Sequence, residues 1–321
     1  MVYDVFLQTV KTAVEKKMGK EYHILLRQIP KNNGILLDGL CIGTAANRIS
    51  PAIYLNSYYS EYEHGMSMDD IVAEIFHLYQ DNQILPGITI EQLTNFQLLK
   101  DKILYKLIQT EPNVEYLKNL PHVSFLDLSI IFYLQIQDTE EGLLTAMIHN
   151  EHLKAWNLSM DELYKLAAVN TPRLLPPVIR DMSDVLKDIA KANMGDHYNE
   201  SLVDELFRDQ NDEDLSPLYV LTNSIGVNGA CCILYNDVLK EFAAKQGKDL
   251  IVLPSSIHEV LLIPKDDKAD YEDLSDMVAE INECEVPLED QLSNQVYLYT
   301  RSDNLLTLVS HNSVSLGETP S

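Results

Sequence analysis

The segment Leu253–Val260 holds the densest group of reactive side chains within apolar sequence, and it reads Leu-Pro-Ser-Ser-Ile-His-Glu-Val. A serine hydroxyl (Ser255 or Ser256), an imidazole base (His258) and an orienting carboxylate (Glu259) are the parts of a nucleophilic relay. These four residues are therefore the candidate catalytic set, and Ser256 and His258 are also candidate binding residues.

Strand geometry weakens the catalytic interpretation of this segment. If Ile257–Ile263 is extended, Ser256 and His258 point to one face and Glu259 to the other. Three neighbouring residues then cannot form a relay without partners distant in sequence. The alternative is a Pro-Ser turn followed by a strand whose polar side chains are satisfied inside the fold.

Metal and phosphate sites are not expected. His149 and His152 stand three residues apart, but a shared metal would need a helix through His149, where the sequence indicates a strand end. The four cysteines lack zinc-like spacing, and reduced, buried thiols are the simpler expectation. Gly226–Gly229 is followed by an expected strand, so it is typical of a turn and not of a phosphate loop. No cofactor is predicted.

Two asparagines at expected strand ends complete the candidate binding residues. Asn223 ends an expected strand at Leu218–Asn223, and a second strand is expected at Ala230–Tyr235. Asn236 follows that strand and is expected to cap a helix ending at Gln246.

The charge balance excludes several classes of protein. The 321 residues carry 24 Lys and Arg against 49 Asp and Glu, a formal net charge of −25, with 46% hydrophobic residues. This hydrophobicity excludes a disordered chain, and the acidity argues against direct nucleic-acid binding. Carboxylates concentrate in Glu200–Asp214 and Asp266–Asp290. They could form an acidic surface for a protein partner or a DNA mimic, or simply the solvated face of a helix whose apolar side carries Tyr271, Leu274, Val278 and Ile281.

The N-terminus and the apolar segments give no sign of export or of a membrane. Met1–Met18 mixes charged and apolar residues, and no stretch approaches about 18 uncharged apolar residues. Together with the cysteine usage, this predicts a cytoplasmic protein.

Periodicity and turn signals predict an α+β fold, with antiparallel hairpin-rich sheets covered by amphipathic helices. The first part is expected to contain a helix at Val5–Lys17 and a hairpin formed by Tyr22–Gln28 and Ile35–Ile42. Ser159 with Glu162 predicts a capped helix through Val169, and Val178–Ala192 a further helix. A final hairpin is expected from Val296–Tyr299 and Leu305–Val309. We divide the chain into regions 1–195 and 196–321, which could share one core, with a frayed tail at 311–321.

The chain resembles an uncharacterised bacterial family known only as a domain of unknown function. The resemblance rests on Leu218–Asn223, on Gly229–Tyr235, on the Leu-Pro-Ser-Ser-Ile-His-Glu-Val motif within Asp249–Pro264, and on the N-terminal stretches Asn33–Leu40 and Pro51–Asn56. It implies a bacterial cytoplasmic protein, often encoded in mobile-element regions. It supplies no activity, ligand or catalytic residue.

These observations favour a non-enzymatic binding or accessory protein with a protein partner. The alternatives are a hydrolase-like enzyme that uses Ser255 or Ser256 with His258, and an acidic DNA-mimic inhibitor.

Overall fold

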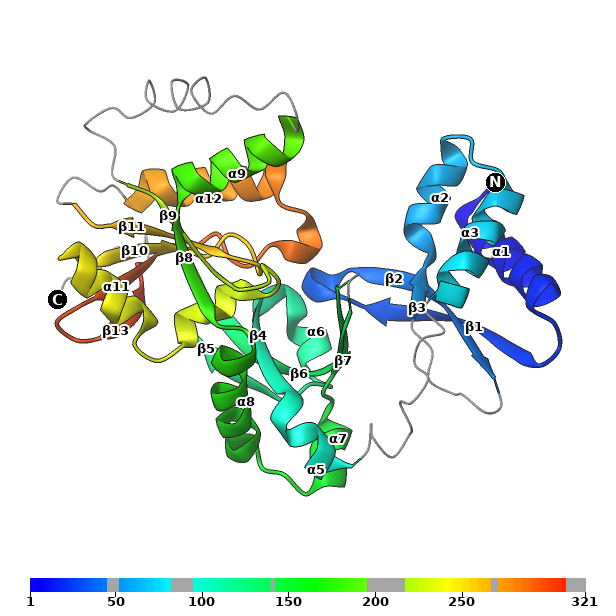
Figure 1. Cartoon of the computed structure of the whole chain (residues 1–321), viewed down its shortest axis with the longest axis horizontal. Coiled ribbons are helices and arrows are strands. Elements are labelled where there is room, and N and C mark those ends of the chain that lie inside the picture. Colours follow the sequence, from blue (N-terminus) through cyan, green and yellow to red (C-terminus); the bar gives the residue numbers. More distant parts are fainter. Residues whose placement is uncertain (45–51, 82–94, 140–141, 195–216, 267–270, 310–321) are drawn as a thin grey trace, which may run out of the picture. The chain divides into compact units, whose positions relative to one another are not determined.

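The computed structural model describes residues 1–44, 52–81, 95–139, 142–194, 217–266 and 271–309 (Figure 1). It is an α+β protein in which every described strand pair is antiparallel and helices cover the sheets, as predicted. Its contacts group into two compact units, residues 1–99 (unit 1) and 100–321 (unit 2). Within the described part of the chain, no helix is both long enough and apolar enough to cross a membrane.

Unit 1 is a three-stranded sheet with helices packed against it. The expected hairpin is confirmed, with Tyr22 opposite Thr44 and Pro30 opposite Leu36. The apolar stripe of the first helix, including Phe6, is buried against this sheet. Its elements are α1 (Tyr3–Met18), β1 (Tyr22–Pro30), η1 (Asn32–Gly34), β2 (Leu36–Thr44), β3 (Ala52–Tyr54), α2 (Leu55–Glu63), α3 (Met68–Asp81) and α5 (Phe96–Leu99).

The first half of unit 2 is built on a four-stranded sheet in which the long strand β6 pairs with β4 on one side and with β5 and β7 on the other. Its elements are η2 (Lys100–Lys102), β4 (Ile103–Gln109), η3 (Glu111–Asn113), α6 (Val114–Leu117), β5 (His122–Phe125), β6 (Leu128–Thr139), β7 (Gly142–Met147), α7 (Asn150–Trp156) and α8 (Met160–Leu174).

The second half of unit 2 is a six-stranded sheet in the order β13-β12-β10-β11-β9-β8. Helices α9 and α12 lie along one side of it (Figure 1). Its elements are β8 (Pro177–Asp181), α9 (Met182–Met194), β9 (Tyr219–Asn223), η5 (Gly229–Leu234), α11 (Val238–Gln246), β10 (Leu250–Leu253), β11 (Val260–Pro264), α12 (Tyr271–Glu285), η6 (Leu288–Asp290), β12 (Tyr297–Thr300) and β13 (Leu305–Leu308).

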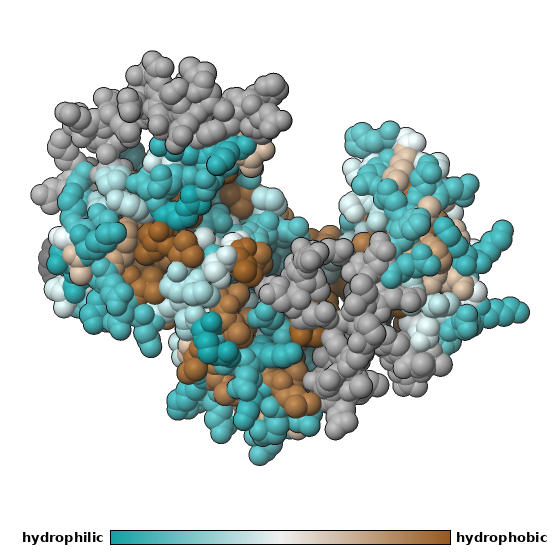
Figure 2. Space-filling view, viewed as in Figure 1, coloured by the Kyte–Doolittle hydropathy of each residue, from teal (hydrophilic) through white to brown (hydrophobic). Residues whose placement is uncertain are grey.

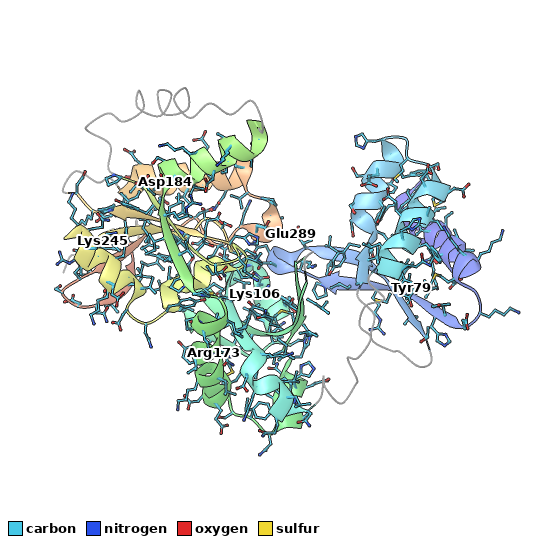
Figure 3. The ribbon with its side chains drawn as sticks, in the orientation of Figure 1. Tyr79, Lys106, Arg173, Asp184, Lys245 and Glu289 are labelled. Atoms are coloured by element: carbon cyan, nitrogen blue, oxygen red, sulfur yellow. The ribbon has the colours of Figure 1, made fainter. Side chains whose placement is uncertain are left out.

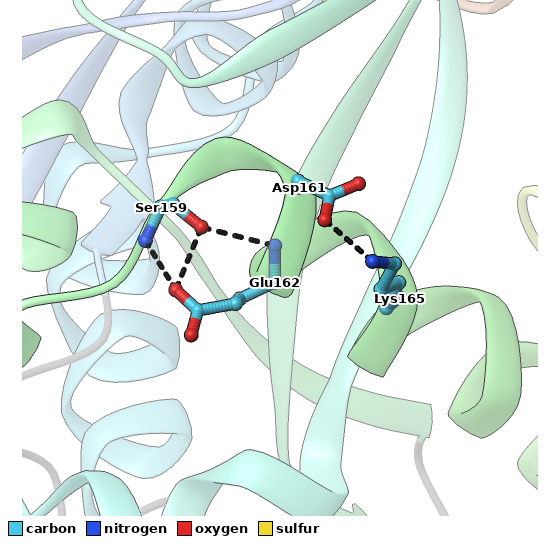
Figure 4. A network of polar contacts seen from close by, with 4 residues as sticks. All are labelled: Ser159, Asp161, Glu162 and Lys165. Carbon is cyan, nitrogen blue, oxygen red and sulfur yellow. Dashed lines mark hydrogen bonds and ion pairs between the residues drawn. The ribbon is translucent and has the colours of Figure 1, made fainter.

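Helix α8 begins with the predicted capping box. The backbone N–H of Glu162 donates to Ser159 Oγ (3.3 Å), and the Glu162 carboxylate accepts from Ser159 N–H (2.9 Å) and from its hydroxyl (2.6 Å), beside an Asp161–Lys165 ion pair (Figure 4). These hydrogen bonds lower the pKa of Glu162. The cap satisfies donors that a helix start otherwise leaves open, and so fixes where α8 begins.

The other end of α8 closes the outer edge of β4. The N–H of Tyr105 donates to Thr171 Oγ1 (3.1 Å), and Asn170 Nδ2 donates to Ile103 O (3.1 Å). Arg173, labelled in Figure 3, bonds Asn170 Oδ1 (3.2 Å) and Asp101 O (2.9 Å), and so holds that asparagine in place. Side chains of one helix thus take the role of a neighbouring strand.

Two secondary-structure predictions for the part of unit 2 before β10 are wrong. The segment expected as a strand at Ala230–Tyr235 is the 3₁₀ helix η5, because β9 already pairs with β8 and β11 and leaves it no open edge. The helix expected from Val178 begins only at Met182, because residues 177–181 pair with β9 as strand β8.

The acidic helix α12 follows its predicted face with one difference. Val278 is buried, and Tyr271 and Leu274 pack beside it against the six-stranded sheet. Asn282 is 2% exposed, whereas Ile281 is 37% exposed. The carboxylates Asp273, Asp276, Glu280 and Glu283 lie on the exposed side, the arrangement of a solvated helix face.

The predicted domain boundary at residue 195 stays a prediction, because 195–216 lies outside the described residues. The strands on either side of it, β8 and β9, pair in one sheet. The acidic run Glu200–Asp214 and the tail 311–321 also lie outside the described residues.

Candidate functional site

The segment 254–259 is a loop between β10 and β11, not the start of a strand. The strand expected from Ile257 begins only at Val260, because the main chain of 254–257 pairs instead with 290–293. Ile257 N–H donates to Asp290 O (2.8 Å), and the N–H groups of Leu292 and Ser293 donate to Ser255 O and Pro254 O (both 2.9 Å). The alternation of faces expected for a strand therefore does not apply here.

Helix α12 anchors the 290–293 side of this pairing. Asn282 Nδ2 donates to Ser293 O (3.2 Å) and to Asn294 Oδ1 (2.6 Å), and Gln291 Nε2 donates to Asn282 O (2.7 Å). The buried asparagine on α12 thus ties the helix to the chain that holds the loop.

Both ring nitrogens of His258 have partners. Nδ1 accepts from the N–H of Asn228 (3.3 Å), and Nε2 lies 3.2 Å from Asp290 Oδ1. A neutral ring that accepts at Nδ1 carries its proton on Nε2 and donates it to the carboxylate. The sequence analysis did not single out Asp290, since it lies 32 residues further along the chain.

Ser256 bonds to the main chain of His258, and Glu259 follows it in the same loop. Ser256 is 5% exposed, and its Oγ accepts from the backbone N–H of His258 (3.0 Å). Burial raises the pKa of Glu259, while His258 and a hydrogen bond from Ser256 counteract part of that rise. Both ring nitrogens of His258 face other groups, the N–H of Asn228 and the carboxylate of Asp290, so neither of them accepts a serine proton in this arrangement. The catalytic assignment stays a prediction.

Close main-chain packing surrounds this group. Thr222 Oγ1 donates to His258 O (2.8 Å), and a side chain at Gly229 would meet both of those atoms as well as Asn223 N. Asn223 is 2% exposed, and its side chain bonds Val227 O (2.7 Å) and Ile225 N (3.1 Å). Its amide therefore holds the 224–228 turn, and its predicted binding role remains untested.

The histidine pair at α7 is a helix cap. His149 is the N-cap residue, and its N–H donates to His152 Nδ1 (2.9 Å). The His152 ring lies on Trp156 with a centroid separation of 5.4 Å. No group of three or more metal-ligating side chains occurs among the residues that the structure describes.

A pocket of about 520 Å³ lies elsewhere in unit 2. The candidate residue Asn236 lines it, whereas Ser255, Ser256, His258 and Glu259 do not. Asn236 does not cap α11: the N-cap residue is Asp237, with φ of 62°. The pocket is lined by Val123, Ser124 and Phe125 of β5, Ile130 of β6, Tyr164 of α8, residues 233–237 with Leu239 and Lys240 of α11, Tyr299 of β12, and Asn304, Leu305 and Leu306 at β13.

The polar groups of the pocket are arranged without net charge. Lys240 Nζ pairs with Asp237 Oδ1 at 3.0 Å, which raises the pKa of the lysine. Tyr299 donates to Asn304 Oδ1 (2.6 Å), and Tyr235 donates to Leu175 O (2.9 Å). The pocket therefore combines apolar and polar walls, and its volume lies in the usual range of ligand sites.

Sequence reasoning reached one pocket residue, Asn236, and missed the rest. The pocket joins segments up to 180 residues apart, from Val123 to Asn304, and none carries a motif. The structure, not the sequence, reveals the two edge strands, because Leu305–Leu308 reads Leu-Leu-Thr-Leu and shows no alternation of apolar and polar residues.

Comparisons with known proteins give one result. The sequence model of a family of unknown function (DUF5688) matches residues 3–301. No match was found among curated proteins or solved structures. Because the match covers nearly the whole sequence, the chain belongs to DUF5688, a family of unknown function.

Proposed function

We propose that this chain is a non-enzymatic binding protein and that the pocket of unit 2 is its binding site. The observation that carries the proposal is the pocket itself, in which apolar and aromatic side chains lie among amide, hydroxyl, charged and main-chain groups. Its lining contains no histidine or cysteine, and its lysine and its aspartate, Lys240 and Asp237, pair with each other.

The surface around the pocket is in keeping with a binding role. Unit 2 shows hydrophobic areas between hydrophilic ones (Figure 2). Leu305, at the pocket, is 54% exposed, and Asn236 is exposed beside it. A ligand that covers an exposed leucine beside polar groups removes apolar surface from water, and this lowers the free energy of the complex.

Fragment binding tests the proposal on the full chain. A set of aromatic and amide-containing fragments is screened by saturation-transfer NMR against the wild type, Ser124→Trp and Ser57→Trp. Ser124 is an exposed pocket residue, and Ser57 is exposed on α2 in unit 1, so the second variant controls for the added indole. We expect Ser124→Trp to weaken fragment binding at least tenfold and Ser57→Trp to leave it unchanged.

Two outcomes would contradict the proposal. Equal fragment binding by both variants would remove the pocket as the site. Hydrolysis of p-nitrophenyl esters that is lost in Ser256→Ala and in His258→Ala would establish the hydrolase alternative instead.

The acidic-partner and DNA-mimic hypotheses stay predictions. The exposed carboxylates of α12 are one of the two acidic stretches that they invoke, and residues 200–214 are the other. Their arrangement on one surface is not part of what the structure describes.

A further inference from the structure

Strand β5 reaches the pocket as an unpaired sheet edge. The N–H of Ile148 donates to Phe132 O, so Phe132 and every second residue before it on β6 bond toward the β5–β7 side. Ile130 therefore forms a hydrogen-bonded pair with Val123. Ser124 and Ser129 lie opposite each other as a non-hydrogen-bonded pair. The N–H and C=O of Ser124 thus point away from β6, at the pocket.

Strand β13 presents a second unpaired edge to the same pocket. The N–H of Val309 donates to Val296 O (2.9 Å), which fixes the alternation along the β12–β13 ladder. Leu306, opposite Tyr299, is then a non-hydrogen-bonded residue whose N–H and C=O point away from β12. Among the described residues, no main-chain or side-chain partner is found for these groups of Leu306 or for those of Ser124.

The edge of β4 shows one way in which this protein closes a strand edge. There, Thr171 and Asn170 supply the hydrogen bonds that a further strand would supply. At the pocket, Ser124 and Leu306 keep theirs open. Open edges are costly because they attract strands from other chains, so two of them at one pocket call for an occupant.

We propose that an extended segment of a partner protein adds as a strand at this pocket and bonds through its main chain to Ser124 and Leu306. The inference rests on the proposed function and names the class of ligand. Main-chain bonds fix the segment, and its alternate side chains lie on Phe125 and on Leu305. Because Asp237 and Lys240 neutralise each other, the segment needs no net charge.

Peptide selection followed by backbone methylation tests the inference. A phage-displayed library of linear dodecapeptides is selected on the full chain, and the tightest peptide is synthesised. Each of its amides is then N-methylated in turn, which removes one donor at a time. We expect about a tenfold loss of affinity at the amides whose N–H donates to Ser124 O or to Leu306 O, and little change at the other amides, because these two residues supply the outward carbonyl groups of the two edges. Affinity should change less than twofold between 50 and 500 mM salt.

Three other outcomes would contradict the addition of a strand at the pocket. Equal sensitivity of all amides to methylation, or sensitivity of none, overturns strand addition, even if Ser124→Trp abolishes peptide binding and so supports the pocket. A selection that yields no peptide sensitive to Ser124→Trp also overturns it, and the fragment experiment then decides the proposed function separately. Strong salt dependence would point to the acidic surface as the site of binding.

Discussion

The loop 254–259 and the pocket of unit 2 are both rich in polar groups, but they use them in opposite ways. In the loop, Ser256 accepts from the N–H of His258, and the His258 ring contacts Asp290 and the N–H of Asn228. At the pocket, Ser124 and Leu306 turn main-chain groups toward an unfilled space.

The difference shows that polar residues close together in sequence do not by themselves indicate a site. Ser, His and Glu look reactive as neighbours, yet here the serine and the histidine are held by groups within the fold. The proposed function instead places binding where hydrogen-bonding groups have no internal partner. Substitutions in the loop should therefore reduce stability and leave binding intact, while substitutions at the pocket should do the reverse.

The largest stability effect is expected for Gly229→Ala. A Cβ there would lie 2.7 Å from Asn223 N and still closer to His258 O and Thr222 Oγ1. Backbone atoms cannot give way cheaply, so we expect a loss of about 3 kcal/mol of unfolding free energy in urea. The matched control is Gly226→Ala, where the added Cβ meets nothing within 4 Å and the φ of +69° costs about 1 kcal/mol. Equal losses for the two variants would mean that the loops are not closely packed.

An intermediate effect is expected for His258→Ala. It removes the contacts of both ring nitrogens, to Asn228 N–H and to Asp290, and should lower the unfolding free energy by about 2 kcal/mol. Fragment and peptide affinities at the pocket should stay within twofold of the wild type. The control is His23→Ala at an exposed position on β1, with an expected change within about 0.5 kcal/mol. A loss of pocket binding in His258→Ala would join the two regions into one site.

The smallest effect, of opposite sign, is expected for Glu259→Gln. Burial raises the pKa of Glu259 above its unfolded value, so this carboxyl favours the folded state when protonated. That contribution is complete below the unfolded pKa and is lost as the pH rises through the raised folded pKa. At pH 7 the variant should be more stable than the wild type by less than about 1 kcal/mol, and the gap should close toward pH 4. Unfolding curves from pH 4 to pH 8 measure it, and a less stable variant at pH 7 would show that the ionised carboxylate holds the loop.

Local signals in the sequence predicted much of the fold. The Asn32–Gly34 turn, where Asn33 and Gly34 have positive φ, set the β1–β2 hairpin, and Ser159 with Glu162 set the start of α8. Both depend on neighbouring residues only. The same local rules failed at residues 230–235, whose apolar pattern suits a strand but whose available sheet edges were already paired.

The candidate site was less predictable because its contacts are distant in sequence. His258 was recognised from its neighbours, but its partners Asn228 and Asp290 follow from the fold. The pocket likewise depends on two edge strands meeting one helix start. Only the register of β5 and β13 reveals that Ser124 and Leu306 face it.

The short length of those two edges has a consequence for behaviour at high concentration. Aggregation by strand pairing is templated by long, flat rows of free amide and carbonyl groups. Strands β5 and β13 are four residues each, and the longer β4 is closed by Thr171 and Asn170. The two rows at the pocket are therefore short templates for strand pairing, and the Thr171 and Asn170 side chains occupy the positions on β4 at which another chain could pair.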